Sequence, residues 1–113
     1  MAKLRVIIES PFAGDTEKHI AYARACVKDS IDRGEAPFAS HLLYTQPGIL
    51  NDENAHERAR GMEAGFAWGP HAQLVAVYTD HGVTKGMQEG ILRAVDNCLP
   101  IVYRTLGGPS IQK

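Results

Sequence analysis

The chain has 113 residues, of which 44% are hydrophobic and 22% are charged, and its formal net charge is −1 with the histidines neutral. This size and composition favour one globular domain over residues 1–113. The nearly balanced charge gives no basis for electrostatic capture of nucleic acid or of an anionic membrane, so neither is an expected partner. No apolar stretch reaches membrane-spanning length and no signal peptide is recognisable, so the expected location is the cytoplasm.

The first part of the chain predicts a strand followed by a helix. The apolar run at residues 4–8 is typical of a buried strand, and a turn-forming loop at 9–15 follows it. Asp15 or the threonine after it can cap a helix over residues 16–33. Apolar side chains recur along this helix at helical spacing, and we expect them to face the core: Ile20, Ala23, Val27 and Ile31.

The rest of the chain continues the alternation of strands and helices. The predicted elements are a strand at 36–40, a helix at 54–68, a strand at 73–79, a helix at 84–97 and a strand at 100–104. The side chains expected to point inward from the two helices are Ala55, Ala59, Met62 and Phe66, then Met87, Ile91, Ala94 and Val95. The tail at 105–113 is rich in glycine, proline and serine, and we expect it to be loosely ordered.

Strands that alternate with helices predict an α/β fold. The expected architecture is a small flavodoxin- or Rossmann-like three-layer sandwich with a four-stranded parallel sheet in the order 2-1-3-4. This order creates a switch point between the first and third strands, where open α/β sheets bind ligands. The loops at 9–15 and 79–86 follow these two strands, so the site is expected between them.

The first loop offers several groups for a ligand. Ser10 carries a hydroxyl, the backbone near Gly14 has free amides, and Asp15 has a carboxylate. The helix that follows presents unpaired N–H groups, which suit a phosphate or a ribose. A plain strand-to-helix turn explains the same residues equally well.

The second loop and two further positions add candidates. Asp80 can bind sugar hydroxyls or simply form the turn, and Thr84 and Gly86 open another helix start to a ligand. His41 can bind a phosphate or transfer a proton, and Arg58 has the planar fork that suits phosphate. A structural role for His41 and a surface ion pair for Arg58 are the alternatives.

Several common sites are disfavoured by missing patterns. The chain has no Gly-x-Gly-x-x-Gly and no phosphate-binding loop of the Walker type, and its five histidines show no metal-ligand spacing. We therefore expect neither a metal ion nor a cofactor. The two cysteines, Cys26 and Cys98, are far apart and are expected to be reduced helix residues.

Five segments taken together resemble a known family: "SPFAGD", "PFASHLL", "ERARGMEAG", "VAVYTDHGVTKGM" and "LPIVYRTL". Their order and spacing are similar to those of the nucleoside 2-deoxyribosyltransferase-like superfamily, and most of all to its small, uncharacterised bacterial and phage branch of domains of unknown function. The resemblance covers about residues 4–106. It implies a nucleoside pocket that includes Pro11 and Phe12, subunit contacts around that pocket, and hence a homo-oligomer.

The resemblance also implies a reaction, cleavage or transfer of the N-glycosidic bond by a glutamate on the helix after the third strand. Thr84, Gly86 and Met87 match the start of that helix. The position of the glutamate, however, is Gly90, and Glu89 lies one residue early, about 100° away around the helix.

Three hypotheses follow. The preferred one is a protein that binds a nucleoside or nucleotide derivative, such as an ADP-ribose-type signal that a phage protein sequesters, in a pocket whose floor Gly90 widens. The second is an N-glycosidase or deoxyribosyltransferase with Glu89 as nucleophile. The third is a scaffold protein without a small-molecule ligand.

Overall fold

A computed structural model describes residues 2–106 and contains one four-stranded parallel sheet. Its strands are β1 (Arg5–Glu9), β2 (Ala36–Phe38), β3 (Leu74–Tyr78) and β4 (Ile101–Arg104). They pair in the order β2-β1-β3-β4, which confirms the predicted α/β fold and strand order. From residue 107 on, the tail that was expected to be loosely ordered falls outside the described residues.

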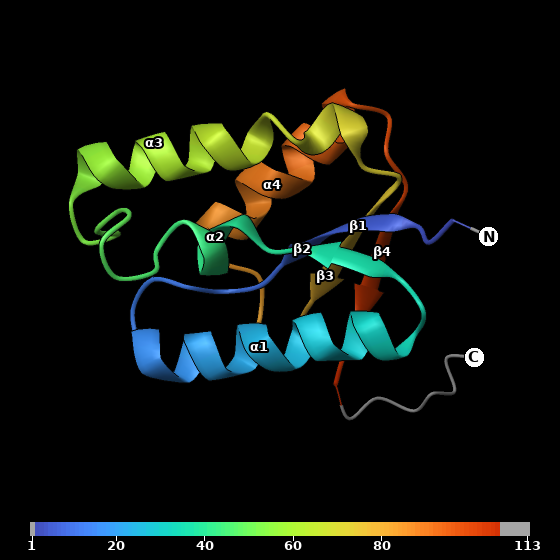
Figure 1. The fold of residues 1–113 in the computed structure, drawn as a ribbon, viewed down its shortest axis with the longest axis horizontal. Coiled ribbons are helices and arrows are strands. Elements are labelled where there is room, and N and C mark those ends of the chain that lie inside the picture. Colours follow the sequence, from blue (N-terminus) through green and yellow to red (C-terminus); the bar gives the residue numbers. More distant parts are fainter. Residues whose placement is uncertain (1, 107–113) are drawn as a thin grey trace.

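Helices cover both faces of this sheet, as Figure 1 shows. They are α1 (Thr16–Asp32), α2 (Ser40–Leu43), α3 (Ala55–Phe66), the 3-10 helix η1 (Gly69–His71) and α4 (Lys85–Asp96). Helix α1 lies on one face of the sheet, and α3 and α4 lie on the other (Figure 1). The short helix α2 was not predicted. Within the described part of the chain, no helix has the length and apolar character needed to cross a membrane.

The three long helices begin at polar caps that the sequence supplies. The side chain of Asp15 accepts a hydrogen bond from the amide of Lys18 at the start of α1. Asn54 caps α3 in the same way, and Thr84 caps α4 by accepting from the amide of Met87. Each cap satisfies an amide that a helix start leaves unpaired, so the helices begin where the sequence predicts.

Two hydrophobic cores lie on opposite faces of the sheet, because successive strand residues point to opposite sides. The core beneath α1 contains Val6, Ile8, Tyr22, Cys26, Ala39, Ala76 and Tyr78. The core beneath α4 contains Val75, Val77, Met87 and Ala94, with Ile7 packed against them. By the same alternation Glu9, the last residue of β1, shares the face of Ile7 and points toward α4.

The predicted inward faces of the helices need correction. Helix α1 buries Tyr22, Ala23, Cys26 and Ser30, whereas Ile31 is exposed. The apolar residues alone predicted the wrong inner face of α1, because Tyr22 and Ser30 are buried with their hydroxyls hydrogen-bonded. In the other two helices three residues expected inside are exposed: Ala55, Ala59 and Val95.

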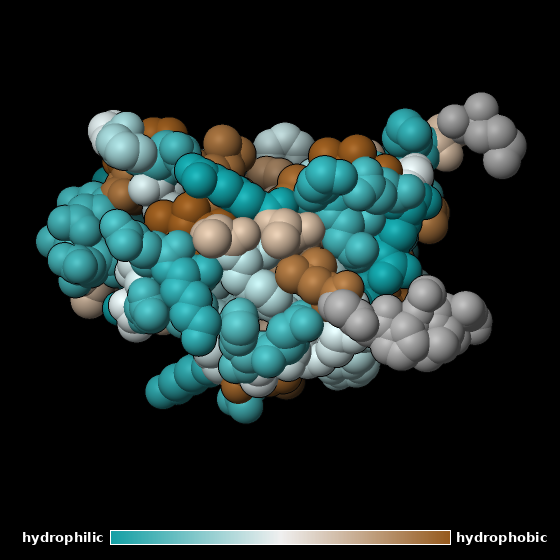
Figure 2. All heavy atoms as spheres, turned by 90° about the horizontal axis from the view of Figure 1, so that it is seen from below, coloured by the Kyte–Doolittle hydropathy of each residue, from teal (hydrophilic) through white to brown (hydrophobic). Residues whose placement is uncertain are grey.

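The outer surface on the α1 side is largely hydrophilic. Figure 2 shows this face, on which hydrophobic residues are scattered among hydrophilic ones. Two exposed ion pairs lie along α1, Lys28 with Asp32 and Arg33 with Asp29. We conclude that α1 turns its charged side outward and its aromatic and sulfur-containing side to the sheet.

A buried polar network ties the end of β4 to the end of α1. The guanidinium of Arg104 donates two hydrogen bonds to the carboxylate of Glu35, at 2.7 and 2.9 Å, and one to the hydroxyl of Tyr78. That hydroxyl donates to Asp29, and Ser30 donates to Glu35. Burial alone raises the pKa of Glu35, but the hydrogen bonds from Arg104 and Ser30 outweigh it and leave the pKa lowered.

Candidate functional site

A cavity of about 630 Å³ opens at the carboxyl end of β1. It is surrounded by the ends of β1 and β2, the helices α2 and α3, and the first two turns of α4. Its lining residues are Glu9, Ser10, Phe12, Ala13, Gly14, Ser40, His41, Asp52, Arg58, Met62, Phe66, Thr84, Lys85, Gly86, Met87 and Glu89. This is the switch-point position that the strand order predicts.

Most of the residues singled out in the sequence lie in this cavity, and four do not. Those that line it are Ser10, Phe12, Gly14, His41, Arg58, Thr84, Gly86, Met87 and Glu89. Pro11 is buried beside it, and Asp15 serves as the cap of α1. The binding role of each of these residues remains a prediction.

Ser10 and His41 form a polar pair in the wall of the cavity. The Oγ atom of Ser10 and the Nε2 atom of His41 are 2.7 Å apart, and the ring of Phe12 stands edge-on to the imidazole. Burial lowers the pKa of His41 to about 4, so the imidazole is neutral at pH 7. A neutral imidazole offers one donor and one acceptor, which suits a hydroxyl or an amide of a ligand better than a bare anion.

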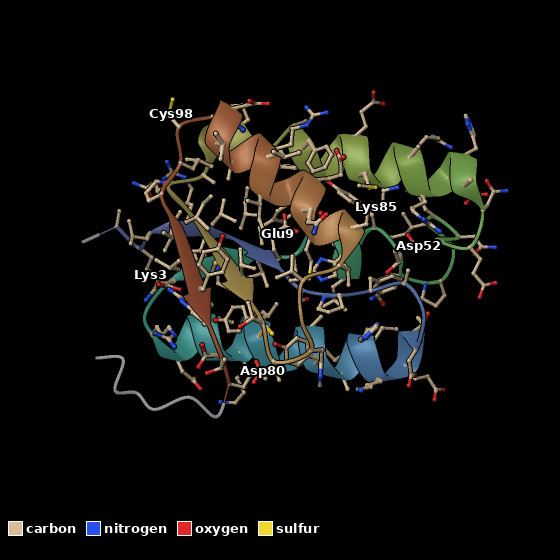
Figure 3. The ribbon with its side chains drawn as sticks, turned by 180° about the vertical axis from the view of Figure 1, so that it is seen from behind. Lys3, Glu9, Asp52, Asp80, Lys85 and Cys98 are labelled. Carbon is tan, nitrogen blue, oxygen red and sulfur yellow. The ribbon has the colours of Figure 1, made fainter. Side chains whose placement is uncertain are left out.

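Glu9 is the most unusual group in the cavity, and it was not predicted as a site residue. It is the last residue of β1, and its carboxyl lies between the sheet and α4, as Figure 3 shows. Burial alone raises its pKa to about 8, with no contribution from a hydrogen bond or a neighbouring charge. The carboxyl is therefore mostly protonated at pH 7. The signal that identifies it is strand parity, which puts the residue two after Ile7 on the α4 face.

Glu9 also corrects the expectation for Gly90. That glycine was expected to widen the floor of the pocket, but its surroundings are full. A Cβ atom added to Gly90 would overlap the carboxyl of Glu9. The space that a side chain on α4 would take is thus occupied from the strand, and Gly90 lines only a small cavity of about 30 Å³ behind Glu9.

Charged side chains stand at the open side of the cavity. Arg58 lies in the first part of α3, and its Nε atom is 3.9 Å from a carboxylate oxygen of Asp52. Lys85 and Glu89 belong to the first two turns of α4 and are exposed. Figure 3 shows Lys85 and Asp52 beyond the strand ends and Glu9 deeper, against α4. The cavity therefore has an uncharged interior and a mouth of mixed charge.

Asp80 lies outside the cavity, contrary to expectation. Figure 3 places it on the α1 side of the sheet. Its carboxylate accepts hydrogen bonds from the hydroxyl of Tyr22 and from the amide of Leu106. These contacts join the loop after β3 to α1 and to the residues after β4, so the geometry indicates a structural role.

Replacement of Asp80 by alanine tests that role. The change leaves the buried Tyr22 hydroxyl without its acceptor, whereas water can replace the acceptor of the exposed Leu106 amide, so the free energy of unfolding should fall by about 1–3 kcal/mol. Chemical denaturation measures it. Tyr22→Phe, which removes the hydrogen bond to the Asp80 carboxylate and the one from the Asp80 amide but keeps that of Leu106, should also lower the free energy of unfolding. A loss of ligand affinity in Asp80→Ala without a loss of stability would restore the sugar-binding role.

Comparison with known proteins agrees with this fold. The pattern of a family described as domain of unknown function DUF7768 matches residues 4–104. A solved structure of a 2-deoxyribosyltransferase from the psychrotolerant bacterium Bacillus psychrosaccharolyticus superposes with a TM-score of 0.61 and 14% identity, over 89% of this chain and 72% of that chain. No curated protein matches. At this identity the likeness establishes the deoxyribosyltransferase-like fold.

Proposed function

The chain belongs to the DUF7768 family, a name that assigns no activity, and from its cavity we propose that it binds a nucleoside or nucleotide derivative. The observation that carries the proposal is the cavity of about 630 Å³ at the switch point of the sheet. Sites for small molecules are commonly of this size, with apolar walls and few polar groups. The deoxyribosyltransferase-like fold supports a nucleoside-related ligand.

The lining suits the parts of such a ligand. Phe12, Met62 and Phe66 offer apolar and aromatic surface to a base, and the guanidinium of Arg93 lies 4.5 Å from the centre of the Phe66 ring. The uncharged interior suits a sugar. Arg58 stands at the mouth and suits a phosphate.

Thermal unfolding with a ligand panel tests the proposal. The panel contains adenosine, deoxyadenosine, adenosine monophosphate, NAD and ADP-ribose, and at least one should raise the unfolding temperature. A ligand at 100 times its dissociation constant adds about 2.7 kcal/mol to the free energy of unfolding. Arg58→Gln should weaken the binding of the phosphate-bearing compounds. Arg24→Gln, on the exposed side of α1, serves as its matched control. An unchanged unfolding temperature with every compound would reject the proposal and favour the scaffold hypothesis.

Cleavage of the N-glycosidic bond is a second candidate function, because two carboxyl groups, those of Glu9 and Glu89, line the same cavity. In this reaction a carboxylate forms a bond to the anomeric carbon while the carbon–nitrogen bond breaks. The base leaves with the electron pair and takes a proton, and water then hydrolyses the glycosyl ester.

Chromatography of the same panel detects a released base. If the reaction occurs, substitution of its nucleophile should stop the release, so Glu89→Gln and Glu9→Gln identify the carboxylate. Absence of free base from all compounds, with binding retained, would leave the chain a binding protein. Sequestration of an ADP-ribose-type signal by a phage protein stays a prediction. It would be supported if the protein retained ADP-ribose during dialysis.

A further inference from the structure

The carboxyl of Glu9 and the missing side chain of Gly90 fit one another. Glu9 ends β1 on the α4 face of the sheet, and Gly90 lies on the inner side of α4 with Met87 and Ala94. A side chain on Gly90 would collide with the Glu9 carboxyl. The close approach of a carboxyl to the helix backbone therefore requires glycine at this position.

The same carboxyl has an unused polar function. Among residues 2–106 no hydrogen bond or neighbouring charge contributes to its pKa, which burial raises to about 8. No fully enclosed side-chain oxygen or nitrogen in this part of the chain lacks a partner. The oxygens of Glu9 therefore open into the cavities they line, where a ligand can reach them.

We propose that Glu9, seated on Gly90, determines specificity: it receives a neutral, hydroxyl-bearing part of the ligand at the floor and turns any anionic part toward the mouth. This inference rests on the proposed function and deepens it. The ligand class it defines is a nucleoside or nucleotide whose sugar, not its phosphate, enters first.

Charge explains this orientation. A phosphate at the floor would meet a carboxyl that repels it when ionised and gives it one donor when protonated. A sugar hydroxyl can accept a hydrogen bond from the protonated carboxyl, and it carries no charge for the ionised form to repel. The cations lie elsewhere, Arg58 and Lys85 at the mouth.

The titratable and charged groups around Glu9 cannot take over its contact with the ligand. From α2 the neutral His41 faces the same cavity, from α4 come Lys85 and Glu89, and from α3 and the loop before it come Arg58 and Asp52. Arg93 of α4 lines the small cavity behind Glu9 and lies over Phe66. Loss of the proton from Glu9 above pH 8 should therefore weaken a ligand that accepts its hydrogen bond.

The pairing is tested without any ligand by a double-mutant cycle. Gly90→Ala should lower the unfolding temperature when Glu9 is present, because the carboxyl must move. In a Glu9→Ala background the same change should have no effect or raise the temperature, since the new methyl group fills vacated space. Equal effects in the two backgrounds would reject the pairing.

The ligand contact is tested by calorimetry with adenosine and adenosine monophosphate as probes. Glu9→Ala should weaken the binding of adenosine at least tenfold at pH 6.5. Glu9→Gln, which keeps the shape and a donor, should retain binding and remove the loss of affinity between pH 7 and pH 9. Glu63→Gln, an exposed glutamate on α3 outside the cavity, is the matched control.

The outcomes separate the two proposals. Binding of a probe to the wild type with unchanged affinity in Glu9→Ala would overturn the role of Glu9 and leave the proposed function standing. Failure of every panel compound to bind the wild type would overturn the proposed function and the ligand contact with it, while the double-mutant cycle still decides the pairing.

Discussion

Replacement of Arg104 by methionine should lower the free energy of unfolding by about 3–5 kcal/mol, since the Glu35 carboxylate would remain largely buried without its partner. The side chains of Arg104 and Glu35 are only 10% and 12% exposed, so water cannot replace the lost pair of hydrogen bonds. The hydroxyl of Tyr78 would lose one donor as well. Urea denaturation at pH 7 measures the loss.

Two further variants show whether the buried charge is the cause. The double variant Arg104→Met with Glu35→Leu removes both charges and should recover much of the stability. Lys28→Ala breaks an ion pair whose side chains are 76% and 60% exposed, and should leave the unfolding midpoint unchanged. A small effect of Arg104→Met, equal to that of Lys28→Ala, would show that the network does not hold β4 to α1.

Replacement of Glu9 by glutamine should make the protein more stable at alkaline pH. In the folded chain the pKa of Glu9 is about 8, against 4.5 for an ordinary glutamate, so folding favours the protonated form. The contribution of the Glu9 proton to the free energy of unfolding is fully present below pH 4.5 and is lost as the pH rises to about 8. The loss at pH 9 is about 2–5 kcal/mol, the lower figure allowing for water in the open cavity.

Unfolding at a series of pH values measures this difference. Wild type and Glu9→Gln should have similar stability below pH 4.5 and should diverge between pH 4.5 and about pH 8, with the variant the more stable. Glu35 has the opposite sign: its lowered pKa means that its contribution is lost as the pH falls below 4.5. Parallel curves for the two proteins would mean that Glu9 is as well hydrated as a surface glutamate.

The sequence was sufficient for the sheet because its signals are local. The apolar runs of β1 and β3 and the polar caps at Asp15, Asn54 and Thr84 mark where elements begin and end. Alternation of strands and helices then leaves few possible topologies. The order of the strands and the position of the cavity both follow from this.

Which side of each helix faces the core was harder to predict, because the burial of a side chain depends on partners that are distant in the sequence. Tyr22 is buried since Asp80, 58 residues away, accepts its hydrogen bond, and Ser30 is buried beside Glu35. Counting apolar residues favoured Ile31 instead, which is exposed. The same distant contact explains why Asp80 lies outside the site that its loop suggested.

Glu9 shows both what the sequence contains and what it lacks. Strand parity alone puts this residue on the α4 face. The contact between this carboxyl and a glycine on α4 depends on how the helix packs against the sheet. No local sequence pattern predicts that packing. The family resemblance predicted a carboxylate on α4 itself and so favoured Glu89, which is an exposed residue of the cavity rim.

The carboxyl of Glu9 has one more consequence, which concerns the heat of binding. Near pH 8 about half of the molecules lack its proton, so a ligand that requires the protonated form draws about half a proton per site from the solution. The buffer supplies that proton, and the apparent enthalpy then includes its ionisation heat. Titrations in phosphate and in Tris at the same pH would therefore give different enthalpies for the same affinity, and the difference counts the protons taken up.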